Sequence, residues 1–151
     1  MRFDYTLLLL VVWPIAITVV TQLTKVLIKL VQTGKIDPHE YYAWGKFPSS
    51  HIALVSALAT VAGLVAGLDS LSFGLALALA VIVTRDALGL RMFVEQHSRA
   101  INILRQQLPR DKQRLIPKQI ERVGHTPLEA FGGATFGIGL TLLLYWILAA
   151  I

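Results

Sequence analysis

The chain has 151 residues, of which 55% are hydrophobic and only 15% charged, and its formal net charge is +5. Soluble domains carry about a quarter charged residues, so this composition excludes a soluble enzyme, a disordered tail and a disulfide-rich secreted domain. The absence of cysteine also excludes disulfides, thiolate catalysis and cysteine metal ligands. Four stretches contain no formal charge, at 5–24, 52–68, 70–84 and 130–151, and they predict an integral membrane protein.

The first predicted span covers 5–31. Its position after Met1 resembles that of a signal peptide, but the stretch is long, lacks a small-residue cleavage site and contains several polar residues, so we expect it to be retained. Lys25 and Lys29 lie four residues apart near its end and therefore on one helix face. Snorkelling to the membrane surface is the ordinary role of such lysines.

The second predicted span, 49–67, follows a loop at about 32–48. Pro48, the last residue of this loop, stops any preceding helix. Ser49 or Ser50 can cap the new helix. His51 then falls in the first turn, where unpaired backbone N–H groups and the helix dipole favour an anion.

The third predicted span, 70–90, is separated from the second by a tight turn and ends in ionisable residues, Arg85, Asp86 and Arg91. Ionisable groups at that depth in a membrane usually face the bundle interior. The segment 92–108 then has apolar residues at helical spacing opposite polar ones, which predicts an amphipathic helix lying at the interface.

The fourth predicted span, 127–149, has a strong helix-start signal. Thr126 fits the N-cap, Pro127 the first helical position and Glu129 the third, which together make a capping box. Capping is therefore one sufficient explanation for Glu129. His125 stands just before this helix, as His51 stands at the start of the second span.

Charge asymmetry predicts the orientation. With four spans, all of the 14 Lys and Arg residues except Arg2 lie on or near one face, which the positive-inside rule assigns to the cytoplasm, with both termini outside. The basic run 110–122 fits this topological excess better than a dedicated lipid-binding site. Gly63 with Gly67, and Gly133 with Gly137, are small-residue pairs that predict close helix packing.

Several helix ends thus bring ionisable side chains to one interfacial pocket. This set suits phosphoryl transfer, because cations and helix N-termini stabilise the transferred group while one imidazole attacks and the other protonates the leaving oxygen. A metal site is the competing use, but the surrounding cations repel a divalent ion. P-loop, H-E-x-x-H and G-x-S-x-G motifs are missing. The residues converging here are Lys25 or Lys29, His51, Asp86, Arg91, His125 and Glu129.

The motif P-S-S-H at 48–51 resembles the P-S-G-H motif of type-2 phosphatidic acid phosphatases and vanadium haloperoxidases. The whole chain is similar to the small divergent branch of that acid phosphatase and haloperoxidase-related superfamily. The matching blocks run in order along almost the whole chain: Lys25, F-P-S-S-H at 47–51, D-A-L-G-L-R at 86–91, Gln96, Asn102 and G-H-T-P-L-E at 124–129.

The resemblance implies that His125 is the nucleophile that forms a phosphohistidine. Glu129, standing where the superfamily places Asp, would orient the imidazole, and His51 would act as general acid. On phosphate esters the superfamily acts without a metal or organic cofactor, so the resemblance implies none here. Two departures bear on phosphate binding: the first motif, K-x6-R-P, is missing, and Gln119 occupies the position of an expected arginine.

We therefore expect Arg91, with Lys25 or Lys46, to supply the phosphate-binding cations. Asp86 completes the proposed catalytic set, and Ser49 and Ser50 the phosphate-binding set.

The sequence thus predicts one membrane-embedded phosphatase-like domain over 1–151, an all-α polytopic helix bundle of about four spans plus an interfacial amphipathic helix. The expected function is metal-independent hydrolysis of a lipid phosphate or pyrophosphate at the cytoplasmic face of the plasma (inner) membrane. Phosphatidylglycerol phosphate, phosphatidic acid and polyprenyl pyrophosphate all remain open as substrates. The expected partners are the bilayer and this lipid, not nucleic acid, and a homo-oligomer stays open.

The alternative is a non-hydrolytic headgroup or anion binder, such as a transporter or scaffold. Vanadate-dependent oxidation is less suited to a lipid-embedded site.

Overall fold

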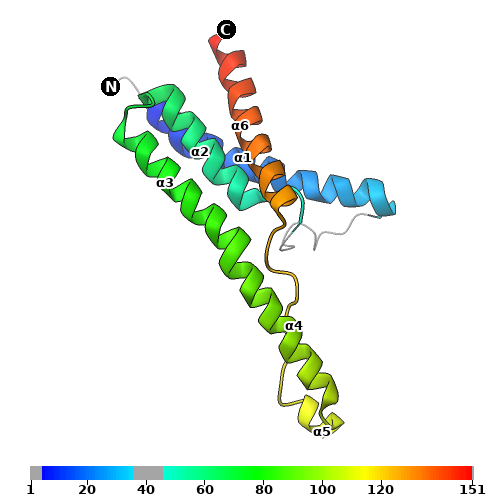
Figure 1. The fold of residues 1–151 in the computed structure, drawn as a ribbon. Helices are drawn as coiled ribbons and strands as arrows, with labels where there is room; N and C mark the ends of the chain where they lie inside the picture. Colours follow the sequence, from blue (N-terminus) through cyan, green and yellow to red (C-terminus); the bar gives the residue numbers. More distant parts are fainter. Residues whose placement is uncertain (1–4, 36–45, 151) are drawn as a thin grey trace.

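The computed structural model describes residues 5–35 and 46–150, and over these ranges the regular structure is helical throughout. This confirms the predicted all-α membrane helix bundle. In chain order the helices are α1 (Tyr5–Thr33), α2 (Ser50–Ala66), α3 (Leu71–Arg85), the π-helix η2 (Asp86–Leu90), α4 (Arg91–Gln107), α5 (Arg110–Gln113) and α6 (Pro127–Ala149) (Figure 1).

The ends of α1, α2, α3 and α6 fall into two groups. The start of α1, the turn between α2 and α3 and the end of α6 lie together at the top of Figure 1. The starts of α2 and α6 lie near the middle of the molecule, close to the junction of α3 and α4. This is the arrangement that alternating crossings require, and it brings the starts of two helices to one level.

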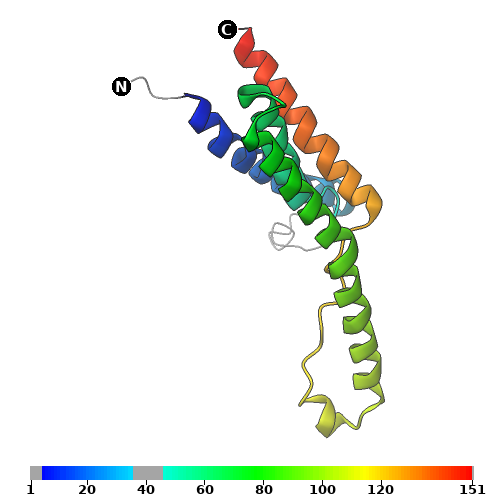
Figure 2. The same cartoon turned by 60° about the vertical axis from the view of Figure 1, so that its left-hand side comes forward.

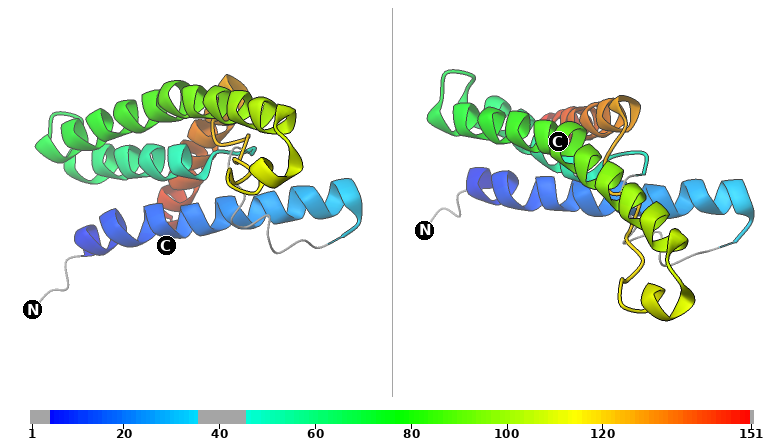
Figure 3. Two further views of the ribbon diagram at one scale, coloured as in Figure 1. Left: turned by 90° about the horizontal axis from the view of Figure 1, so that it is seen from below. Right: turned by 60° about the horizontal axis from the view of Figure 1, so that its bottom comes forward.

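Helix α2 is the centre of the bundle. It packs against α1, α3 and α6, and seen from below it lies between α1 on one side and α3 on the other (Figure 3). Its buried face consists largely of small residues, including Ala53, Ala57 and Ala62, which allow neighbouring helices to approach closely.

Glycines on α6 make the closest of these approaches. A Cβ atom on Gly133 would lie 2.4 Å from the carbonyl oxygen of Ser49, and one on Gly137 would lie 2.3 Å from that of Ala53. The predicted packing role of this pair is confirmed. In the other predicted pair, Gly63 does pack against α3, but Gly67 ends α2 with a φ of 96°, a conformation that favours glycine.

Within residues 5–35 and 46–150, three helical stretches are long and apolar enough to cross a membrane: Val12–Thr33, Leu71–Gln107 and Pro127–Ala149. The remaining expected span, α2, is a shorter apolar helix of 17 residues, which is at the lower end of the range of about 17–25 residues for a spanning helix.

The expected amphipathic helix is present as α4. It continues the axis of α3 and extends beyond the bundle (Figure 2). The axis is not broken because backbone hydrogen bonding runs through η2: the N–H of Asp86 reaches back to Ile82 and Val83, and that of Arg91 reaches Asp86 and Gly89.

Candidate active site

Two backbone hydrogen bonds join the segments that carry the candidate residues. The N–H of Ser49 donates to the carbonyl of Glu129 (3.1 Å), and the N–H of His125 donates to the carbonyl of Ala87 in η2 (3.2 Å). Next to these bonds, buried Ile52, Ala87 and Ala130 pack together. The starts of α2 and α6 are therefore held against the π-helical turn by both polar and apolar contacts.

The predicted capping box at the start of α6 is confirmed. Thr126 Oγ1 accepts a hydrogen bond from the N–H of Glu129 (3.2 Å), and Glu129 Oε2 accepts one from the N–H of Thr126 (2.9 Å). Satisfying these N–H groups explains locally why the helix begins here. It also fixes the direction in which the Glu129 carboxylate points.

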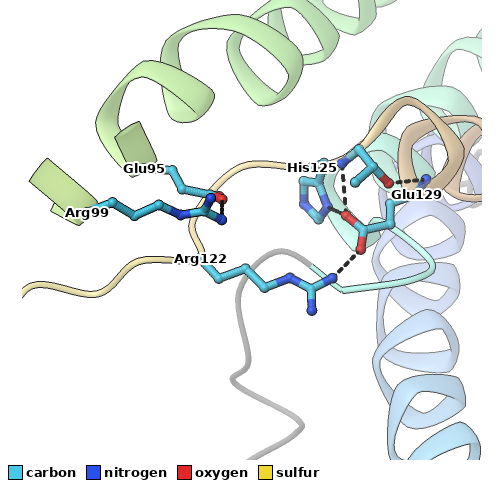
Figure 4. A network of polar contacts seen from close by, with 6 residues as sticks. Glu95, Arg99, Arg122, His125 and Glu129 are labelled. Atoms are coloured by element: carbon cyan, nitrogen blue, oxygen red, sulfur yellow. Dashed lines mark hydrogen bonds and ion pairs between the residues drawn. The ribbon is translucent and has the colours of Figure 1, made fainter. Parts of the chain in front are cut away.

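Capping is only one of the contacts of Glu129. Its Oε1 accepts a hydrogen bond from Arg122 Nη2 at 2.7 Å, and its Oε2 lies 3.4 Å from His125 Nδ1. Figure 4 shows Arg122 and His125 approaching the carboxylate together. The contact with Nδ1 is electrostatic, since that nitrogen has no hydrogen-bond partner of good geometry.

His125 is almost completely buried, with 3% of its surface exposed. Burial lowers the pKa of its imidazole below the ordinary value of 6.5, because the charged form loses its hydration. Lys25 and His51 lower the pKa further, whereas the Glu129 carboxylate raises it. The balance favours a neutral imidazole near neutral pH, and a neutral imidazole has the free electron pair that a nucleophile needs.

His51 lies in the first turn of α2, as predicted, and its side chain is exposed. Arg91, Lys25 and Asp86 lie within electrostatic range of its imidazole. Arg91 Nε donates to Asp86 Oδ2 at 2.6 Å across the π-helical turn. The two histidines also interact electrostatically with each other, so the structure brings the predicted acid and nucleophile into one region.

A polar cavity of about 330 Å³ adjoins Glu129. Lys25 is 95% buried against the bundle, since only 5% of its surface is exposed, and this excludes a simple snorkelling role for it. The described lining thus combines several cations with one carboxylate. It consists of Lys25, Ile28, Lys29, Gln32, Lys46, Phe47, Arg122 and Glu129.

The two predicted serines are both buried. Ser49 Oγ accepts from the N–H of Ile52 at 3.5 Å and so caps α2. Its hydroxyl therefore serves the helix start directly.

No site role was predicted for Arg122, which the sequence presents only as part of the basic run 110–122. Gln119, which occupies the expected arginine position, instead donates from its side chain to the carbonyl of Pro117. Arg122 lies closer to His125 in the chain, and its partner Glu129 is in the next helix. The position of Arg122, three residues before His125, was the only feature of the sequence that could have indicated a site role for it.

Within residues 5–35 and 46–150, no three His, Asp or Glu side chains are grouped closely enough to hold an ion.

Comparison with known proteins shows the family of this chain by sequence. The model of the divergent PAP2 family matches residues 8–140. The uncharacterized membrane protein YuiD of Bacillus subtilis (strain 168) is 34% identical over 141 residues, covering 86% of this chain and 89% of its own length. No solved structure matches.

Proposed function

The chain belongs to the divergent PAP2 family, and we propose that it is a metal-independent hydrolase of a membrane lipid phosphate or pyrophosphate. The observation that carries the proposal is the buried His125 facing the Glu129 carboxylate, which is itself held by Thr126 and Arg122. A carboxylate that orients one nitrogen of an imidazole directs the other toward a substrate. Packing alone does not require such an arrangement.

In the first step, Nε2 of neutral His125 attacks phosphorus. The P–N bond forms while the bond between phosphorus and the leaving oxygen breaks, and His51 donates a proton to that oxygen. Glu129 stabilises the positive charge that develops on His125. The products of this step are phosphohistidine and either a lipid alcohol or, from a pyrophosphate, a lipid monophosphate.

In the second step, water attacks the phosphohistidine. His51, now neutral, removes a proton from the water, the P–N bond breaks, and the electron pair returns to His125. Inorganic phosphate leaves, and the site is back in its starting state, with His51 protonated and His125 neutral.

Cations stabilise the transferred phosphoryl group in this proposal. Arg91, oriented by its ion pair with Asp86, and buried Lys25 both act on His51 electrostatically. Lys46 and Arg122 line the neighbouring cavity. Ser49 contributes by capping the start of α2, whose first-turn N–H groups, beginning at Ser50, attract an anion.

An amphiphilic substrate suits this position. The candidate residues gather at the ends of apolar helices, so a headgroup can reach them while its chain stays in the bilayer. The predicted charge asymmetry favours access from the cytoplasmic face of the plasma membrane.

The decisive experiment measures phosphate release from phosphatidylglycerol phosphate, phosphatidic acid and polyprenyl pyrophosphate, by purified protein in detergent with a chelator present. We expect turnover that vanadate inhibits and that His125→Asn abolishes. His97→Asn is the matched control, because His97 is exposed on α4 away from the site, and it should keep full activity. Equal turnover by His125→Asn and the unaltered protein would refute the phosphohistidine step.

The cation-rich cavity favours a second candidate, a headgroup-binding protein without turnover. Lys25, Lys29, Lys46 and Arg122 line it together, and they would bind an anionic headgroup without any histidine chemistry. Binding of lipid phosphate to vesicle-reconstituted protein, with no phosphate release and no effect of His125→Asn, would identify this function.

A further inference from the structure

The segment between α4 and α6 leads directly into the site, although it has little regular structure. Apart from the single turn of α5, residues 108–126 form no described helix. Such a segment needs tie points if its last residues are to keep one position, because its backbone groups have no helical partners. Those tie points are side chains of α4, the helix that precedes it.

Asn102 makes the central tie. Its Oδ1 accepts from the N–H of Gln119 (2.9 Å), and its Nδ2 donates to the carbonyl of the same residue (2.9 Å) and to Glu121 Oε1 (2.6 Å). Asn102 is also 97% buried, since 3% of its surface is exposed. Its amide therefore pairs with the backbone of Gln119 as a neighbouring peptide group would.

Arg105, almost one turn further along α4, supports the same segment. Its Nε donates to the carbonyls of Gln113 (3.2 Å) and Ile116 (2.7 Å). In the segment 108–126, which we call the returning segment, the early part is thus tied to α4 by Arg105 and the later part by Asn102.

The tie at Asn102 lies next to the site in the chain. Arg122, which follows Glu121, binds Glu129 at 2.7 Å. Gly124 then passes close to Met92, where an added Cβ would lie 3.2 Å from Met92 atoms, and the N–H of His125 binds Ala87. The stretch carrying Arg122 and His125 is therefore held at its start by Asn102 and at its end by η2.

We propose that Asn102 is a positioning residue for the reaction. Its amide fixes the backbone of the segment that presents Arg122 and His125 to Glu129. This inference rests on the proposed function. Asn102 touches neither the site residues nor a substrate, and it acts through the backbone of Gln119 and the side chain of Glu121. An amide is required, because the interaction needs a donor and an acceptor side by side.

A donor–acceptor exchange tests this role. Asn102→Asp keeps the size of the side chain and its bond to the Gln119 N–H, but it loses both donated bonds and faces Glu121 with a second carboxylate. A misplacement of about 1 Å can reduce turnover about 100-fold, so we expect a kcat loss of about 10- to 100-fold with little change in KM. In the double variant Asn102→Asp, Glu121→Gln, the new amide can donate to the new carboxylate, and kcat should recover about tenfold.

Arg99→Gln is the control on the same helix, because Arg99 is exposed and forms its ion pair with Glu95, one turn before it on α4. This variant should keep the kcat of the unaltered protein. A merely structural role for Asn102 would lower the melting temperature and the folded yield while leaving kcat per folded molecule unchanged, and that result would overturn the proposal. Failure of the double variant to recover any kcat would overturn it as well.

A readout without turnover separates this inference from the proposed function. In histidine-labelled protein, the NMR signals of the His125 imidazole are assigned by their loss in His125→Asn. Asn102→Asp should shift these signals, because the imidazole leaves its buried position beside Glu129, whereas Arg99→Gln should not. If the unaltered protein hydrolyses no lipid phosphate but this shift occurs, the hydrolase proposal fails and the positioning role stands. Unchanged His125 signals in Asn102→Asp would overturn the positioning role.

Discussion

Replacing Gly133 by alanine should force α2 and α6 apart at the level of the candidate site. The new Cβ would lie 2.4 Å from the carbonyl oxygen of Ser49, whereas ordinary contact begins near 3.4 Å, so about 1 Å of separation is needed. Such overpacking costs about 1–3 kcal/mol. For a chain of this size, each kcal/mol lowers the melting temperature by about 2–4 °C.

The same displacement should reduce turnover, because Ser49 precedes His51 and Gly133 lies one turn after Glu129. A shift of about 1 Å between reacting groups can cost about 100-fold in rate. Gly137→Ala, whose Cβ would lie 2.3 Å from the Ala53 carbonyl, should lower stability similarly. Its effect on kcat should be smaller, because this contact lies one turn further from the histidines.

Melting temperature and kcat of the purified variants measure both effects. Gly139→Ala is the matched control, because nothing lies within 4 Å of its added Cβ and it carries the same gain in helix propensity, about 1 kcal/mol. If Gly133→Ala melts and turns over like Gly139→Ala, the close approach of the two helices does not exist in the protein and the reasoning fails.

Four further predictions address the chemistry. Glu129→Gln retains a capping side chain but loses the charge beside His125, so kcat should fall about 10²- to 10⁴-fold. Circular dichroism should show unchanged helicity. An unaltered kcat would contradict the orienting role of Glu129. Because burial lowers the pKa of His125 and the neutral form attacks, the acid limb of kcat/KM against pH should lie below 6.5, and a limb above that value would argue against His125. Glu129 raises this pKa, so Glu129→Gln should move the same limb to still lower pH. Asp86→Asn breaks a partly exposed ion pair with Arg91 that is worth about 1 kcal/mol or less, so the melting temperature should hardly change. KM should rise, because Arg91 loses its orientation. A large fall in melting temperature with constant KM would contradict the orienting role of Asp86.

The class of the protein and the starts of its helices could be predicted from the sequence because both depend on local properties. Low charge content and long apolar stretches indicate membrane helices wherever the chain folds. The capping residues Thr126, Pro127 and Glu129 act within one turn, and Ser49 likewise caps α2. The packing role of Gly133 and Gly137 also followed from spacing alone, because residues four apart share a helix face.

The roles of individual charges depended on contacts through space. Lys25 and Lys29 have the same local sequence environment, yet Lys25 is buried against the bundle. Arg122 resembled every other cation of a basic connection until the fold placed it 2.7 Å from Glu129. The continuation of α3 into α4 likewise depends on backbone hydrogen bonding through η2.

The sequence by itself determined a membrane helix bundle with two histidines, each at or just before the start of a helix, since composition and capping act over short stretches of chain. Only the tertiary structure decided which side chains surround them. Asn102 meets Gln119 across 17 positions of chain, and the starts of α2 and α6 meet through Ser49 and Glu129. Such contacts arise when helices pack, and no local pattern of residue types encodes them.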